Sequence, residues 1–263
     1  MRRFADDPQQ GRLTRVTGLQ AGIVAGAGVL AGIANTIAGG GSLLTFPALL
    51  GAGLSPLAAN VTNTVGLVPG LASGSHGYRA ELAGQGRRVV RLGIPMAVGA
   101  VIGTALLLTT PPGLFTHIVP WLIIPSCLAL LFQPALARVV GDRADERSLV
   151  LRLGLVLGGV YSGYFGAALS VMLLAVLGLF INDTLQRLNA TKVALTTISN
   201  AIAAVGFAIF GPVNWLDALV LAAGTVVGGL LGAAAGRRIP PLALRLGVAA
   251  IGLGVAVKLL VAP

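Results

Sequence analysis

The sequence has 263 residues, of which 56% are hydrophobic and 10% are charged, and its mean hydropathy is +0.91. This composition is too apolar for an ordinary soluble domain and indicates a multi-pass membrane protein. The net charge of +10 could point to nucleic acid, but the 18 Lys and Arg residues lie mostly in short connectors rather than along one stripe, so we expect no nucleic-acid partner.

Charge-poor windows recur along the chain, and each spanning helix needs about 20 mostly apolar residues. The short alternating segments of a transmembrane barrel do not occur in the sequence. Residues 1–17 form a polar segment that resembles the start of a signal peptide, but the apolar run behind it has a counterpart later in the chain, so we expect it to be retained. We therefore predict an all-α integral membrane protein of about eight transmembrane helices.

The first apolar segment, residues 18–38, ends at three consecutive glycines, and a second apolar piece, residues 42–54, follows directly. Glycines leave the backbone free to adopt positive φ, so we expect the helix to break. In lipid, such a break is tolerated only where protein or a water-filled cavity covers the unpaired amides. The second piece would point its free amides and the positive end of its dipole into that cavity, which suits an anion. A helix kink or a close-packing patch is the alternative for these predicted binding residues, Gly39, Gly40, Gly41 and Ser42.

The third segment, residues 55–78, carries an unusually polar patch and has a histidine near its end. The patch residues could donate hydrogen bonds to substrate oxygens, or they could bond neighbouring helices. Histidine titrates near neutral pH and could relay protons, although an interfacial histidine is the simpler interpretation. The residues are Asn60, Thr62, Asn63 and His76.

Two more helices, residues 92–109 and 114–133, complete the first half, and a charged connector over 134–148 follows. The second half repeats the first. Displaced by 127 residues, and then by 129, the earlier glycines and polar residues fall on later ones: Gly32 on Gly159, Gly39 on Gly166, Asn60 on Asn189, Thr62 on Thr191 and Gly99 on Gly228. We interpret this as a duplication into two membrane repeats, residues 18–133 and 149–263.

The second repeat is predicted to contain a broken element over residues 149–181 and helices over 184–210, 215–236 and 242–261. Its break at 166–169 is weaker than the first, because it has one glycine instead of three. Transporter folds are commonly built from two repeats whose broken helices meet near the bilayer midplane at the substrate site.

The orientation is left open by the basic residues. Four spans per half would put residues 1–15, 79–91 and 134–152 on one side, which accounts for 12 of the 18 basic residues and looks cytoplasmic. The same count puts Arg237 and Arg238 on the opposite side.

Lys192 is the most distinctive candidate for a substrate contact. It follows Asn189 and Thr191 in a helix without a nearby acid, and its counterpart in the first half is Asn63. Ionisable residues at membrane depth are costly and usually face a cavity or a partner. A cation in one half and an amide in the other would suit an anion between them; a lysine that extends to the interface is the alternative.

Other features carry less chemistry. Trp215 and Asp217 are interpreted as an interface anchor at a helix start. The sequence contains no phosphate-binding loop, no group of His, Cys or acidic residues with metal-ligand spacing, and a single cysteine, Cys127. We therefore expect no cofactor, no metal site and no enzymatic activity.

Several of these features together resemble the sulfite exporter TauE/SafE family. They are the triple glycine and proline within residues 32–47, the Ala-Asn-x-Thr-Asn patch, His76, and the later Asn-Ala-Thr-Lys followed by Gly-Pro-Val-Asn-Trp at 211–215. The resemblance covers residues 18–260 and departs at 166–169, where the family often repeats a glycine cluster. It implies a bacterial inner-membrane permease for sulfur-containing anions that uses an ion gradient or the membrane potential, with the glycine break and the patches around Asn60 and Asn189 along its pathway.

The sequence therefore predicts a secondary transporter that works by alternating access, and by resemblance an exporter of sulfite, sulfoacetate or other organosulfonates. The expected partners are a small anionic substrate and the lipid bilayer, with a coupling ion and a homo-oligomer as possible additions. A carrier of another small metabolite and a non-transporting membrane scaffold are the alternatives. The exact substrate, the direction of transport and the coupling ion stay open.

Overall fold

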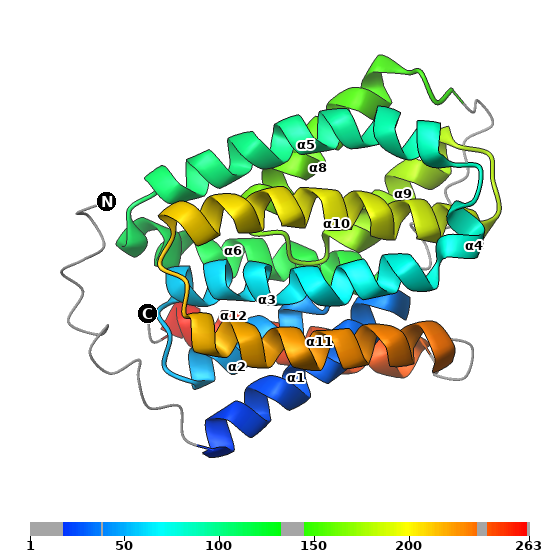
Figure 1. Ribbon diagram of the computed structural model, residues 1–263. Coiled ribbons are helices and arrows are strands. Elements are labelled where there is room, and N and C mark those ends of the chain that lie inside the picture. The colour runs from blue at the N-terminus through cyan, green and yellow to red at the C-terminus, as the bar shows by residue number, and fades with distance from the viewer. Residues whose placement is uncertain (1–17, 38, 133–144, 236–240, 262–263) are drawn as a thin grey trace.

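The computed structural model describes residues 18–37, 39–132, 145–235 and 241–261, and the regular structure in these ranges is entirely helical (Figure 1). In chain order the helices are α1 (Gly18–Ile37), α2 (Ser42–Gly51), α3 (Pro56–Gly77), α4 (Arg79–Leu82), α5 (Gly86–Thr109), α6 (Pro112–Leu131), α8 (Leu149–Tyr164), α9 (Leu169–Phe180), α10 (Leu185–Phe210), α11 (Trp215–Ala235) and α12 (Pro241–Val261).

Five of the described helices, α1, α5, α6, α10 and α11, are long and apolar enough to cross a membrane. Two others, α3 and α12, have comparable lengths of 22 and 21 residues. The remaining apolar helices, α2, α8 and α9, are shorter. The prediction of an all-helical, multi-pass membrane protein is thus confirmed, whereas the count of about eight spans stays a prediction.

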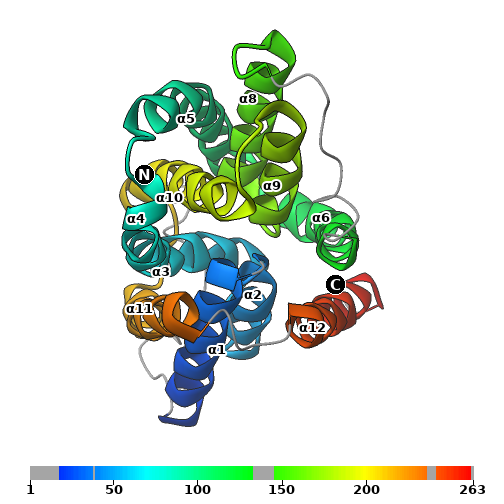
Figure 2. The same ribbon diagram turned by 90° about the vertical axis from the view of Figure 1, so that its right-hand side faces the viewer.

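The first broken element turns back on itself. A Cβ atom placed on Gly41 would lie 2.4 Å from the carbonyl oxygen of Ala31 and 2.7 Å from Nδ2 of Asn35, so Gly41 lies against α1 before that helix ends. The helix α2 therefore runs back beside α1 as the second arm of a hairpin (Figure 2). In the second half α8 and α9 also pack against each other around a break.

This reversal corrects the predicted topology. Counting each broken element as one span placed residues 1–15 on the same side as 79–91, but α1 begins at one end of the bundle and α4 lies at the other (Figure 1). Residues 1–15 and 237–238 themselves lie outside the described ranges. The end of α11 and the start of α12, which flank 237–238, lie at the α4 end (Figure 1). A hairpin returns the chain to the side it came from, which the spacing of apolar residues does not reveal.

Close glycine contacts join the helices in two equivalent groups. A Cβ atom on Gly32 of α1 would lie 2.4 Å from the carbonyl oxygen of Thr225 in α11, and one on Gly99 of α5 would lie 2.0 Å from that of Val156 in α8. Small residues allow this approach in lipid. The helix α3 packs against α11, and α10 packs against α5. The group α1, α11 and α3 thus has the same pairwise contacts as the group α8, α5 and α10.

Ion pairs join three connectors at the α4 end of the bundle. The Arg88 guanidinium lies 2.6 Å from carboxylate oxygens of both Glu146 and Asp183, and Arg187 lies 3.1 Å from Asp183. Burial opposes ionisation of Asp183, but the hydrogen bonds from Arg88, the Thr184 amide and Arg187 outweigh it and hold the pKa of this carboxyl below its ordinary value. The helix α5 begins at residue 86 and not at the predicted residue 92, so it includes Arg88. The ion pairs neutralise the charge of Arg88 at this position.

Candidate functional site

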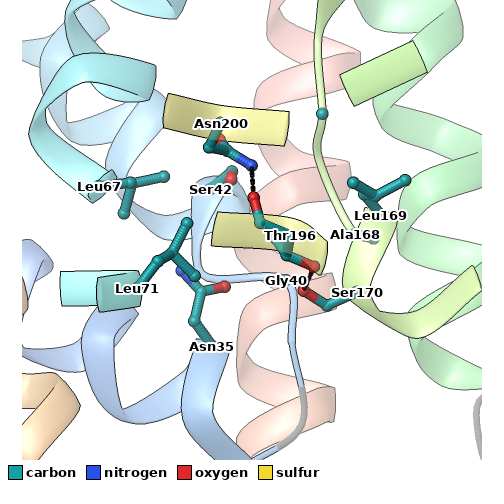
Figure 3. Close-up of a pocket in the computed structure, with 11 residues that line it drawn as sticks. Asn35, Gly40, Ser42, Leu67, Leu71, Ala168, Leu169, Ser170, Thr196 and Asn200 are labelled. Atoms are coloured by element: carbon teal, nitrogen blue, oxygen red, sulfur yellow. Dashed lines mark hydrogen bonds between the residues drawn. The ribbon is translucent and has the colours of Figure 1, made fainter. Parts of the chain in front are cut away.

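A small polar cavity lies where the two helix breaks meet (Figure 3). The first break contributes the segment between α1 and α2, and the second contributes the segment between α8 and α9. The lining residues come from both halves of the chain: Asn35, Gly40, Ser42, Leu67, Leu71, Gly166, Ala168, Leu169, Ser170, Thr196 and Asn200. The cavity volume is about 10 Å³, which is close to the minimum that one water molecule needs.

The first break is built on glycine geometry. Gly39 and Gly40 have φ values of +90° and +82°, in the left-handed region that glycine adopts without strain. The Asn35 side chain accepts a hydrogen bond of 2.8 Å from the Gly41 amide. The helix break predicted at the three glycines is therefore confirmed over residues 39–41, and Asn35 fixes its shape.

The expectation of a row of free amides is only partly met. The amides of Leu43 and Leu44 donate to the carbonyl oxygens of Gly40 and Gly41 over 2.9 Å each, and the Gly41 amide is taken by Asn35. For the amides of Gly40 and Ser42 no acceptor is found among the described residues. Within this tight turn, the carbonyl oxygens of Gly40 and Gly41 accept hydrogen bonds from amides three residues later, so few amides stay free for a ligand.

The second break forms despite its single glycine. Gly166 has a φ of +72°, and Ala168 adopts the left-handed conformation at φ 54°, which costs an alanine about 1–2 kcal/mol. The Tyr161 hydroxyl donates a hydrogen bond of 2.7 Å to the Ala167 carbonyl oxygen, and it lies 2.6 Å from the Ser126 hydroxyl. These contacts hold the strained turn in place.

The α10 wall of the cavity is polar over two helical turns. The Thr196 and Ser170 hydroxyl oxygens lie 3.3 Å apart, and the Asn200 amide donates to the Thr196 carbonyl oxygen over 3.0 Å (Figure 3). The α3 side of the cavity carries Leu67 and Leu71 instead. The sequence analysis missed Asn35, Ser170, Thr196 and Asn200 as lining residues. For Thr196 and Asn200 the four-residue spacing from Lys192 was the available signal.

Lys192 lies one turn before Thr196 on the same face of α10. Its side chain has 0% exposure, so it does not extend to the surface as an interfacial lysine would. Its Nζ atom has no hydrogen-bond partner among the described residues. Arg245 of α12 adds a second positive charge that acts on this ammonium group, and no described acid does so.

The remaining predicted residues do not line the cavity. Their side chains bond neighbouring segments instead: Asn60 donates to the Tyr164 carbonyl oxygen at 3.0 Å, Thr62 accepts from the Asn214 amide at 2.9 Å, Asn63 accepts from the Thr45 hydroxyl, Asn189 donates to the Tyr78 hydroxyl at 2.7 Å, and Thr191 donates to Gln85 at 3.1 Å. His76 is exposed at the end of α3, where its Nε2 lies 3.3 Å from Arg79. The structure thus brings Gly40 and Ser42 together in one site, with Lys192 a turn away.

The described residues contain no group of three or more His, Cys, Asp or Glu side chains placed to hold a metal ion. The polar lining of the cavity consists of hydroxyl and amide side chains and of glycine backbone. Such groups can donate hydrogen bonds to oxygen atoms, and a lysine one helical turn away favours negative charge. The donor groups therefore match the chemistry of an oxyanion, although the cavity in this conformation is large enough only for one water molecule.

Comparison with known proteins identifies the chain as similar to membrane transporters. The family described as "Sulfite exporter TauE/SafE" matches residues 24–259. The chain is 32% identical over 210 residues to a "Probable membrane transporter protein" of Haemophilus influenzae, covering 78% of this chain and 81% of that protein. It is 31% identical over 236 residues to "Probable membrane transporter protein YfcA" of Escherichia coli K12, covering 86% and 83%. No solved structure matches the chain.

Proposed function

This chain belongs to the sulfite exporter TauE/SafE family and is a membrane transporter, and we propose that it exports small sulfur-containing anions by alternating access. Sulfite, sulfoacetate and other organosulfonates are the proposed substrates. The family name suggests that the substrate contains sulfur, and the residues of the site support a substrate with a negative charge.

The observation that carries the proposal is the buried, unpartnered ammonium group of Lys192, a residue one helical turn before Thr196 in the cavity wall. An isolated charge buried away from water costs several kcal/mol unless it is paired. The described residues supply no carboxylate partner for it. A bound anion would supply the missing charge, and the hydroxyl groups of Ser42, Ser170 and Thr196 would contact its oxygens.

The small size of the cavity supports an occluded conformation, in which the site is closed to both sides of the membrane. A volume of about 10 Å³ admits one water molecule, whereas sulfite has four heavy atoms. Transport therefore requires the two hairpin tips to separate. We propose that the hairpins α1/α2 and α8/α9 move relative to each other and open the site to one side at a time, as in other transporters with midplane sites.

Two repeats with opposite orientation are the proposed basis of this movement. The contacts among α1, α11 and α3 match the contacts among α8, α5 and α10, and this correspondence supports two repeats. We propose that α3 and α12 cross the membrane together with the five apolar helices, and that the two hairpins reach only to the midplane. The proposed repeats are residues 18–133 and 149–263, joined by the connector 134–148.

The described arginines support an orientation in the bacterial inner membrane. All of them lie in α4 or near the ends of helices at the α4 end of the bundle: Arg79, Arg87, Arg88, Arg91, Arg147, Arg152, Arg187 and Arg245. Basic residues collect on the cytoplasmic side of such membranes. We therefore propose that the α4 end faces the cytoplasm.

Flux in proteoliposomes tests the proposal. Purified protein is reconstituted, and the efflux of radiolabelled sulfite, sulfoacetate, a carboxylate, a neutral sugar and an organic cation is measured. We expect sulfite or a sulfonate to leave the vesicles faster than from protein-free vesicles, and excess unlabelled substrate to compete. Transport of only the sugar or the cation would contradict the anion site, and no flux of any solute would favour the scaffold alternative.

A further inference from the structure

A second charge-bearing side chain has an unpartnered buried atom and does not line the cavity. Asp217, in the first turn of α11, is 1% exposed, and its Oδ1 atom has no hydrogen-bond partner among the described residues. Its own amide donates to the Asn214 side chain at 3.2 Å. The sequence predicts Trp215 and Asp217 as an interface anchor at a helix start, and both do lie in the first turn of α11, where Trp215 is exposed. The Asp217 side chain, however, is buried.

The register of the surrounding helices places Asp217 inside the bundle. One turn later on α11, Leu221 lies against Gly28 of α1 and Gly66 of α3, and one further turn on, Thr225 lies against the glycines that follow at the same spacing, Gly32 and Gly70. Residues four apart share a helix face. The same register puts Asp217 level with Val24 of α1 and Thr62 of α3. Val24 and Thr62 both have 0% exposure.

Within the described ranges, the elements packed against this face offer Asp217 no counter-charge. The described residues of α1 include no titratable side chain, and His76 in α3 lies in that helix's last turn, at the opposite end from Thr62. Residues 211–214, which lead into α11, are also free of titratable groups. Among the described acids, Asp183 and Glu146 are paired with arginines, and Glu81 and Asp145 are not buried. Asp217 is thus the single described acid that is both buried and unpaired.

The balance of energies favours a bound proton on this carboxyl group. The positive end of the α11 dipole stabilises a carboxylate by about 0.3–1 kcal/mol at an exposed position. Burying an unpaired carboxylate costs several kcal/mol. The neutral, protonated form is therefore the stable one while the site is closed. When α1 moves with its hairpin and water reaches Asp217, the charged form becomes accessible and the proton can leave.

We propose that Asp217 is the binding site for the proton that drives transport. This inference rests on the proposed transport function and adds its coupling ion. In each cycle a proton from the water on one side of the membrane forms an O–H bond with the Asp217 carboxylate, and this bond breaks and returns the proton to water once the site is open to the other side. No other atom or electron is exchanged. The Thr62–Asn214 hydrogen bond of 2.9 Å ties α3 to the start of α11, which leaves α1 as the neighbour whose movement exposes Asp217.

The direct test is infrared difference spectroscopy of the full chain in lipid vesicles while the pH is varied, with no substrate present. The wild-type protein should show a carbonyl stretch of a protonated carboxyl group that disappears at higher pH. Asp217→Asn, which has the shape of the protonated side chain, should lack this band. Glu81→Gln removes a carboxyl group from α4, outside the bundle core, and should keep it. An unchanged band in Asp217→Asn would overturn the proposal.

Transport measurements separate this inference from the proposed function. Asp217→Asn should exchange labelled for unlabelled sulfite at equal pH but should lose accumulation driven by a pH gradient, whereas Glu81→Gln should retain both. Retained pH-driven accumulation in Asp217→Asn would refute the coupling role. If the wild type moves no anion, the proposed function fails, while the infrared band still decides whether Asp217 binds a proton. If Asp217→Asn does not fold, Asp217→Glu serves instead and should show the carbonyl band at a shifted frequency. A band at the wild-type frequency in Asp217→Glu, or no band, would contradict proton binding at Asp217.

Discussion

Replacing Lys192 by methionine separates stability from transport, because the two should change in opposite directions. Methionine has nearly the same length and volume as lysine but carries no charge. The lysine side chain is fully buried, and its Nζ atom has no partner among the described residues. Replacing buried ion pairs by packed apolar groups stabilises proteins by up to about 4 kcal/mol, and an unpaired buried charge has no attraction to a partner that the replacement would remove. We therefore expect Lys192→Met to melt at a higher temperature than the wild type in the absence of substrate.

The same substitution should weaken anion binding. A hydrogen bond to a charged group contributes about 1.5–3 kcal/mol, and each 1.4 kcal/mol is a factor of ten in affinity. The KM for sulfite efflux should consequently rise about 10- to 100-fold. Melting temperature and efflux kinetics are measured on the same preparation, and Lys258→Met, at the exposed end of α12, serves as the control. A KM for Lys192→Met equal to that of Lys258→Met would refute the assignment of Lys192 to the anion site.

Three further predictions concern the two breaks and the ion pairs. Gly40→Leu forces a side chain onto a φ of +82°, which should cost about 1–3 kcal/mol and abolish efflux; normal efflux would show that this turn does not shape the site. Tyr161→Phe removes the hydrogen bond to the Ala167 carbonyl oxygen, so melting should show a loss of about 1 kcal/mol and efflux should slow, whereas unchanged efflux would mean that the second turn holds without it. For Asp183, burial opposes ionisation, but the hydrogen bonds with Arg88 outweigh this effect and lower the pKa of the carboxyl group. The ionised Asp183 therefore stabilises the fold fully above the unfolded pKa of about 3.9, and this stabilisation is lost as the pH falls towards the lower pKa of the folded state. Asp183→Asn should therefore lower the melting temperature at neutral pH and reduce its further fall below about pH 4, and an identical acid profile in both proteins would argue against the pair.

Local backbone chemistry made the first break predictable. Three glycines in an apolar run both permit positive φ and weaken the helix, and the structure places the turn at these residues. The second break was underestimated because its conformation depends on the Tyr161 hydroxyl, which bonds to Ala167 across the turn. Tyr161 lies six residues before Ala167, so the sequence at the turn itself contains no glycine run that would reveal this constraint.

The lining of the cavity was harder to predict than its location. The two polar patches around Asn60 and Asn189 were predicted to contact the substrate because they are unusually polar for membrane helices and recur in both halves. In the structure those side chains bond neighbouring segments, and Thr196 and Asn200 face the cavity two turns further along α10. Which face of a polar helix meets a cavity depends on how that helix is rotated against its neighbours.

The sequence by itself determined the membrane class, the helical content, the family and the position of the glycine turn, because each of these follows from composition or from a few consecutive residues. Only the tertiary structure decided that α2 folds back along α1, that the two turns share one cavity, and that Lys192 and Asp217 are buried without partners among the described residues. Direction of travel after a turn, helix rotation and burial are set by contacts between segments far apart in the chain. Those contacts are properties of the packed molecule, and the order of residues does not state them.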